Sequence, residues 1–285
     1  MGERALHTLF EGGSFFEGPR WHDGAWWVSD FYAGLVRTIS PEGDVDEVLH
    51  LSTQPSGLGW LPDGSLLVVS MTDRTLRRWT PEGGLVVHAD LSSHAGGHLN
   101  DMVADAQGRA YVGNFGFDLM GGGDATPADL VRVDPDGSVT VVASDLMFPN
   151  GAVITPDGST LIVGETMGLR YTAFDIDADG GLSGRRTWAE LDGIAPDGCA
   201  LDADGQIWAA DAVGNRCVRI AEGGQVTDEV AAPDGLGIFA CMLGGSAGTT
   251  LLMCAAPDYF EHNRRDTTEA VLLTVEVDVA RAGLP

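Results

Sequence analysis

Four polar side chains recur at one position of a repeated pattern and could together bind a cation. Asn100, Asn150 and Asp197 each lie eight residues before the glycine of a predicted tight turn, and Glu17 lies seven residues before such a glycine. Two carboxylates and two amide oxygens at one point would form a set of hard donors suited to Ca²⁺ or a similar hard divalent ion. Taken singly, each residue is better explained as a turn former. The shared register favours a cation site over four unrelated turns.

Short strand-like runs separated by turn sequences fill the chain and would position these side chains. The aligned turn glycines lie at positions 24, 64, 108, 158, 205 and 248, so the pattern recurs every 40 to 50 residues. Repeats of this length that contain several strands are typical of β-propeller blades. The pattern predicts an all-β, six-bladed β-propeller with four antiparallel strands per blade, folded as one domain over residues 1–285.

The two ends of the chain are predicted to close the ring. The run at 270–277 lacks a partner strand, and residues 6–10 could supply it and cover an open sheet edge. The innermost strand of each blade lines the central channel, so one repeat position faces the axis from several directions. Ser56 and, approximately, Ala240 hold this position in the other two units. Glu17, Asn100, Asn150 and Asp197 are therefore expected to converge.

The composition argues against nucleic acids and membranes as binding partners. The chain has 42 acidic residues and 16 basic residues, all of them arginines, for a net charge of −26. Such a charge repels nucleic acids and acidic membrane surfaces. The missing lysine excludes a P-loop lysine and a Schiff base. Four separate cysteines, at 199, 217, 241 and 254, suit free thiols. With no apolar leader and no run of 18 apolar residues, a cytoplasmic protein without membrane or nucleic-acid partners is predicted; its oligomeric state is open.

Four short motifs around the repeat position resemble those of a known family. The motifs are Phe-Glu-Gly-Pro at 16–19, Leu-Asn-Asp at 99–101, Pro-Asn-Gly at 149–151 and Pro-Asp-Gly at 196–198. Through them the chain resembles, nearly throughout and in order, the regucalcin/gluconolactonase (senescence marker protein) family of six-bladed propellers, which is related to diisopropylfluorophosphatase. The resemblance implies a divalent-metal hydrolase that acts mainly on lactones.

The resemblance also implies residue roles. Glu17, Asn150 and Asp197 would bind one divalent metal ion, and Asn100 would lie beside it as a ligand or substrate contact. Asp197 would also be the general base. No sulfur or imidazole ligand falls in the register, which argues against a tetrahedral zinc-type site. Ca²⁺ is therefore favoured, with Mn²⁺, Mg²⁺, Fe²⁺ and Zn²⁺ left open.

One departure from the family concerns the substrate. His98 stands where sugar-lactone members often carry an arginine two residues before the asparagine. This change favours a less hydroxylated or more apolar lactone or ester, with His98 either contacting substrate or serving only as a structural residue. Asn114 and Phe115, together with Tyr259 in the 256–266 loop, could form a substrate-contacting rim at the channel mouth or simply pack as loops.

Three hypotheses follow. The leading one is a metal-dependent lactonase or esterase; the others are a phosphotriesterase of the diisopropylfluorophosphatase type and a non-catalytic calcium-binding propeller.

Two further motifs are predicted to be plain turns. Gly-Gly-Ser-Ala-Gly at 244–248 precedes a strand rather than the helix of a serine-hydrolase elbow. The Asp-rich segment at 175–180 lacks the glutamate that ends an EF-hand loop, since Arg186 stands there.

Overall fold

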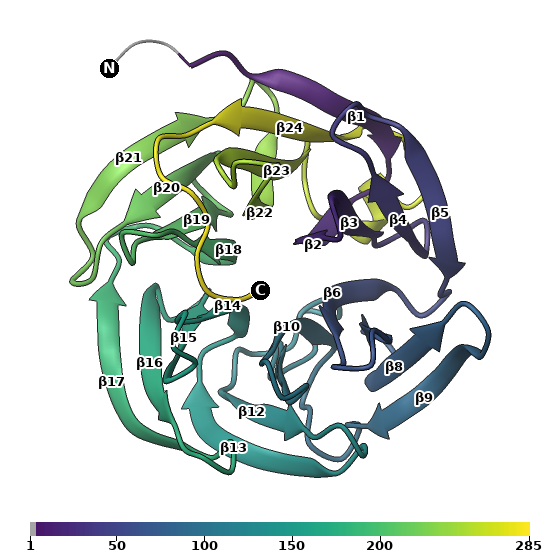
Figure 1. The fold of residues 1–285 in the computed structure, drawn as a ribbon, viewed down its shortest axis with the longest axis vertical. Coiled ribbons are helices and arrows are strands. Elements are labelled where there is room, and N and C mark those ends of the chain that lie inside the picture. Colours follow the sequence, from purple (N-terminus) through teal and green to yellow (C-terminus); the bar gives the residue numbers. More distant parts are fainter. Residues whose placement is uncertain (1–3) are drawn as a thin grey trace.

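The computed structural model describes residues 4–285 and shows six four-stranded antiparallel sheets around one axis (Figure 1). The predicted six-bladed β-propeller is confirmed. That residues 1–285 form one domain stays a prediction, because residues 1–3 lie outside the described part.

The blades follow one another along the chain, and the innermost strand comes first in each. The strands are β2 (Phe16–His22), β3 (Ala25–Asp30), β4 (Leu35–Ile39) and β5 (Val45–His50); β6 (Pro55–Trp60), β7 (Leu66–Ser70), β8 (Thr75–Thr80) and β9 (Gly84–Asp90); β10 (Leu99–Ala104), β11 (Ala110–Asn114), β12 (Ala128–Val133) and β13 (Val139–Leu146); β14 (Pro149–Ile154), β15 (Thr160–Glu165), β16 (Arg170–Ile176) and β17 (Leu182–Glu190); β18 (Pro196–Leu201), β19 (Ile207–Asp211), β20 (Arg216–Ile220) and β21 (Val226–Ala231); and β22 (Gly237–Gly244), β23 (Thr250–Ala256), β24 (Ala270–Glu276) and β1 (His7–Gly13). One short helix, α1 (Glu261–Arg264), lies between β23 and β24.

The N-terminal strand closes the ring as predicted. β1 pairs antiparallel with β24, from His7 opposite Thr274 to Gly13 opposite Ala270, and so completes the blade of β22–β24. Pairing covers the outer edge of β24, which would otherwise offer unpaired backbone groups to another chain.

Each inner strand carries a register shift next to the repeat position, which re-aims the side chains there. Neighbouring inner strands also approach closely at glycines. A Cβ at Gly151 would lie 2.4 Å from the carbonyl oxygen of Asp197, and one at Gly198 would lie 2.5 Å from the Cβ of Ala240. Only glycine fits such a contact. The inner strands therefore converge tightly enough to bring the preceding side chains together.

The core lies between the blades at their inner strands. All eight residues of β22 are buried, whereas most residues of the outer strand β17 are exposed. Trp26 and Trp208 are among the largest fully buried side chains, as expected for residues that pack between blades.

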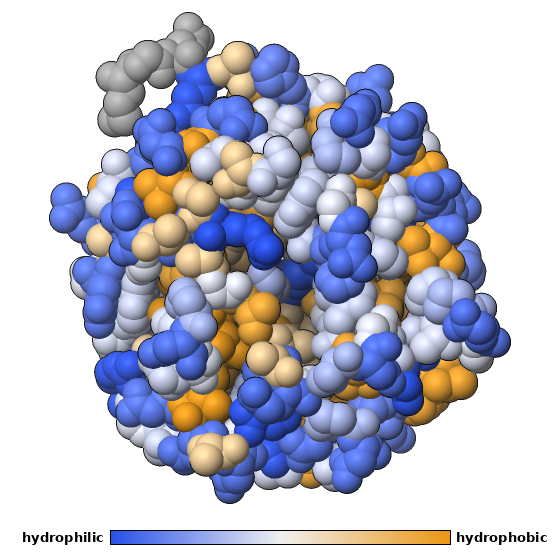
Figure 2. Space-filling view, in the orientation of Figure 1, coloured by the Kyte–Doolittle hydropathy of each residue, from blue (hydrophilic) through white to orange (hydrophobic). Residues whose placement is uncertain are grey.

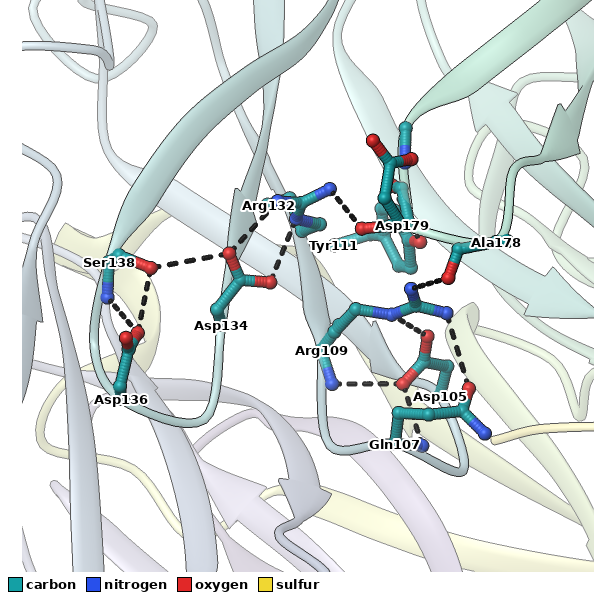
Figure 3. A network of polar contacts seen from close by, with 12 residues as sticks. Asp105, Gln107, Arg109, Tyr111, Arg132, Asp134, Asp136, Ser138, Ala178 and Asp179 are labelled. Carbon is teal, nitrogen blue, oxygen red and sulfur yellow. Dashed lines mark hydrogen bonds and ion pairs between the residues drawn. The ribbon is translucent and has the colours of Figure 1, made fainter.

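Polar contacts tie the turn at 177–181 to the neighbouring blade (Figure 3). Arg109 Nη1 donates to the carbonyl oxygen of Ala178 at 3.2 Å, and Arg132 Nη1 donates to that of Asp179 at 2.9 Å. Tyr111 donates to the carbonyl oxygen of Gly180 at 3.0 Å. The Asp-rich segment is thus the turn between β16 and β17, and it contacts the neighbouring blade. The glycine-rich motif at 244–248 is likewise the turn between β22 and β23.

The C-terminal segment crosses the end of the channel at which the inner strands finish, and it is the yellow tube near the axis in Figure 1. Leu284 bridges to Ile154, the last residue of β14, and Arg281 bridges to Asp202. Hydrophilic side chains cover most of this face (Figure 2). Among residues 4–285, no helix is long and apolar enough to cross a bilayer.

Candidate active site

A cavity of about 390 Å³ opens at the end of the channel where the inner strands begin. Its lining includes Glu17 from β2, Asn100 from β10, Asn150 from β14 and Asp197 from β18. All four residues are buried within the protein. The repeat thus brings the four side chains to one cavity from four blades.

Hydrogen bonds orient the carboxylate of Asp197. Asn150 Nδ2 donates to Asp197 Oδ1 at 2.6 Å and to Thr166 Oγ1 at 3.0 Å. Thr166 in turn donates to the carbonyl oxygen of Pro196 at 2.8 Å. The amide nitrogen of Asn150 is thereby used, and among residues 4–285 no donor contacts its Oδ1. That oxygen remains available to a cation.

Burial perturbs both carboxyl groups. Desolvation raises the pKa of Asp197 to about 7, against the lowering effect of the hydrogen bond from Asn150. Desolvation, and then repulsion from Asp197 and Asp101, raises the pKa of Glu17 well above its ordinary value. A cation between the two groups would favour their ionised forms. The pair therefore has the electrostatic character of a cation site.

Arg20 lies close to these acids but is already paired. Its Nη2 contacts Asp101 Oδ1 at 2.5 Å, and its Nε donates to the carbonyl oxygen of Leu58 at 3.0 Å. Both members of the pair are buried. Arg20 lowers the pKa of Glu17 less than burial and the neighbouring carboxylates raise it. Its charge therefore does not neutralise the site.

Aromatic side chains form much of the cavity wall. The ring centroids of Phe15 and Phe239 lie 4.9 Å apart, and those of Phe115 and Phe148 lie 4.6 Å apart. Phe148 has a φ of 61°, a strained value for a bulky residue that tends to occur at functional sites. Tyr32 donates to the carbonyl oxygen of Tyr259 at 2.7 Å. This bond ties the 256–266 loop to the wall.

The other sequence-predicted residues divide into two groups. Phe115 and Tyr259 line the cavity, whereas His98 and Asn114 do not. Asn114 Nδ2 donates to the carbonyl oxygen of Asp129 at 2.8 Å, and its Oδ1 accepts from the Gly116 amide at 2.9 Å. Half-buried His98 packs against Phe115 with ring centroids 5.9 Å apart. These two residues lie outside the cavity lining and contact residues at or next to Phe115 in its wall.

The sixth blade differs from its predicted alignment. The register shift in β22 lies between Ile238 and Ala240, so Phe239 lines the cavity while Ala240 packs against Gly198. Ser56 is buried but does not line the cavity. Among the described residues, the inner strands of four blades therefore bring polar side chains to the cavity, and those of the other two blades do not.

Sequence reasoning missed a second set of cavity residues. They directly follow the second strand of a blade, where the chain turns back: Phe31 and Tyr32 after β3, Thr166 and Met167 after β15, and Ala212 and Val213 after β19. Phe115, which the sequence analysis did name, holds the equivalent place directly after β11. The repeat register that identified the inner-strand residues would also have identified these positions.

Comparison with known proteins identifies the family. Residues 15–257 match the family described as SMP-30/Gluconolactonase/LRE-like region. The chain belongs to this family. The predicted resemblance to this family is thereby confirmed, and the relation to diisopropylfluorophosphatase stays a prediction.

Its relatives include two curated enzymes and a solved structure. The chain is 27% identical over 208 residues to a 6-deoxy-6-sulfogluconolactonase of Pseudomonas putida, covering 72% of this chain and 70% of the relative. It is 30% identical over 206 residues to a pentonolactonase of Haloferax volcanii, covering 68% and 65%. The structure of a calcium-binding regucalcin from Agrobacterium tumefaciens superposes with a TM-score of 0.82 at 21% identity, covering 99% and 97%. This last likeness concerns the fold.

Proposed function

We propose that this protein is a metal-dependent hydrolase that opens the ring of a lactone or a related ester. The observation that carries the proposal is the pair of buried carboxyl groups, Glu17 and Asp197, with Asn150 and Asn100 at one cavity. The lactonases among its relatives support the reaction class.

The donor set fits a hard divalent cation, with Ca²⁺ favoured and Mn²⁺, Mg²⁺, Fe²⁺ and Zn²⁺ as alternatives. Glu17, Asn150 and Asp197 would hold it, with Asn100 alongside. Within residues 4–285, no three His, Cys, Asp or Glu side chains group to hold a metal ion, so the proposed site depends on its amide oxygens. When bound, the cation would polarise the substrate carbonyl and stabilise the negative charge that develops there.

Asp197 would be the general base. It would take a proton from a water molecule whose oxygen bonds to the carbonyl carbon. The ring C–O bond would then break and its oxygen would receive the proton held by Asp197, which gives a hydroxy acid and restores the carboxylate. Asn150 would hold Asp197 in position through the 2.6 Å hydrogen bond, and Thr166 would hold Asn150. Positioning of this kind would supply much of the rate, because an ionised carboxylate beside a cation is a weak base.

A substrate panel with and without chelator tests the proposal. It should contain γ- and δ-lactones, an aryl ester and a phosphotriester. We expect metal-dependent turnover of lactones, lost in Asp197→Asn and kept in Asp192→Asn, an exposed control in the segment that leads into β18. Turnover of the phosphotriester alone would favour the phosphotriesterase hypothesis. Binding of Ca²⁺ without turnover of any compound would favour a calcium-binding propeller.

A further inference from the structure

The cavity offers very few polar groups to a substrate. Apart from the four residues of the proposed cation site, Thr166, Tyr32 and Tyr259 are the only described residues that bring polar side-chain atoms to its lining. Thr166 donates to the carbonyl oxygen of Pro196 and Tyr32 to that of Tyr259. Among residues 4–285, only the Tyr259 hydroxyl is left without a hydrogen bond in this set. Arginine and histidine are absent from the lining in the described part of the chain.

A polyhydroxylated ring would therefore bind poorly here. Each substrate hydroxyl buried without a partner weakens binding by roughly 5- to 150-fold. Outside the four residues of the proposed cation site, the described lining could satisfy one hydroxyl through Tyr259, whereas a sugar lactone carries several. An apolar substituent makes no hydrogen bonds to water, so it loses none on entering such a cavity.

The apolar wall continues outward to an exposed rim. Ten large apolar side chains are exposed among the described residues, and five of them line this one cavity: Met120, Met167, Leu169, Val213 and Tyr259. Val213 is the most exposed at 69%. The rim residues follow β11, β15, β19 and β23, so they come from four different blades. Exposed apolar side chains that gather at one opening are typical of a binding site.

We infer that the substrate of this site is a lactone or ester with an apolar substituent, such as an alkyl chain or an aromatic ring. This inference rests on the proposed function. The carbonyl lies at the four polar side chains, and the substituent runs along the phenylalanine wall and leaves past the rim. Phe115 and Phe148 on one side, and Phe15 and Phe239 on another, contact the substituent.

A series of δ-lactones with alkyl chains of increasing length tests this inference against glucono-δ-lactone. Each buried methylene should raise kcat/KM about fourfold until the chain reaches solvent at the rim. Glucono-δ-lactone should fall below the long-chain lactones by a factor on the order of 100 or more. A flat series, or preference for glucono-δ-lactone with turnover still metal-dependent, overturns the inference and leaves the proposed function standing.

Rim variants locate the effect. In Val213→Asn and Met167→Gln, the ratio of kcat/KM for the longest chain to that for the unsubstituted ring should fall about tenfold or more. Val226→Asn, on the outer strand β21 of the same blade as Val213, is the matched control, because Val226 is exposed but lies outside the cavity. An equal change in the control, or no change in either rim variant, contradicts the assigned path of the substituent.

A binding measurement separates the inference from the proposed function. Alkyl δ-lactams share the shape of the lactones and resist hydrolysis. Calorimetric titration of the metal-loaded protein should give affinities that rise with chain length. This rise without turnover of any lactone would refute the proposed function and support the apolar site; no rise would refute the apolar site.

Discussion

Replacing Asp197 with asparagine should stabilise the metal-free protein while it abolishes turnover. Burial raises the pKa of Asp197 from 3.8 to about 7. The folded protein therefore holds this proton up to about pH 7, while the unfolded chain releases it near pH 4. Because the folded state binds more protons in this window, the stability of the metal-free protein falls as the pH rises from about 4 to 7.

The linkage relation gives the size of the effect. With these two pKa values, the raised pKa of Asp197 costs the folded metal-free protein about 4 kcal/mol at pH 8, where the group is ionised, and about 2 kcal/mol at pH 5, where it takes up a proton on folding. Asparagine carries no charge and keeps an oxygen that can accept the bond from Asn150. The variant should thus gain at most about 4 kcal/mol at pH 8, a rise in Tm on the order of 10 °C.

Thermal and urea unfolding at pH 5 and pH 8, with chelator or with Ca²⁺, measure this gain. The wild type should be stabilised by Ca²⁺ more at pH 8 than at pH 5, whereas the variant should respond weakly. Asp192→Asn should match the wild type throughout. A metal-free variant less stable than the wild type at pH 8, or a difference independent of pH, would refute the assignment of Asp197 as a buried, desolvated carboxylate.

Three further predictions concern the site and the ring. Glu17→Gln should weaken Ca²⁺ binding at least about tenfold in a calorimetric titration, because it removes one of two ligand charges; unchanged affinity would remove Glu17 from the site. Gly151→Ala should lower stability by about 1–3 kcal/mol and reduce turnover, because its Cβ would meet the carbonyl oxygen of Asp197 at 2.4 Å. Gly181→Ala, whose Cβ would meet only the carboxylate ends of Asp179 and Asp177, the nearer at 3.2 Å, should change both far less. Deleting β1 should produce aggregates in gel filtration, because it exposes the edge of β24; a monomer of unchanged stability would contradict its closing role.

The fold and the four polar site residues were predictable from the sequence because both depend on a period that the chain repeats. Turn glycines fix where each blade begins its first hairpin. The inner-strand glycines, such as Gly151 and Gly198, fix how closely the strands approach the axis. Asn150 and Asp197 precede these glycines, so their convergence follows from the same repeat.

Part of the cavity wall was less predictable because it depends on packing between blades. His98 lies two residues before Asn100, but its ring packs against Phe115 and not into the cavity. In β22 the register shift presents Phe239, which the position of Ala240 in the repeat does not indicate. Neither the register shift in β22 nor the side-chain contacts between blades produce a pattern that recurs at the repeat spacing in the sequence.

Anomalous scattering from crystals grown with Ca²⁺ or Mn²⁺ tests the proposed cation site most directly. One strong peak should lie between the side-chain oxygens of Glu17, Asn150 and Asp197, with Asn100 beside it. No peak at these residues, or a cation bound only elsewhere on the acidic surface, would contradict the proposed metal-dependent chemistry.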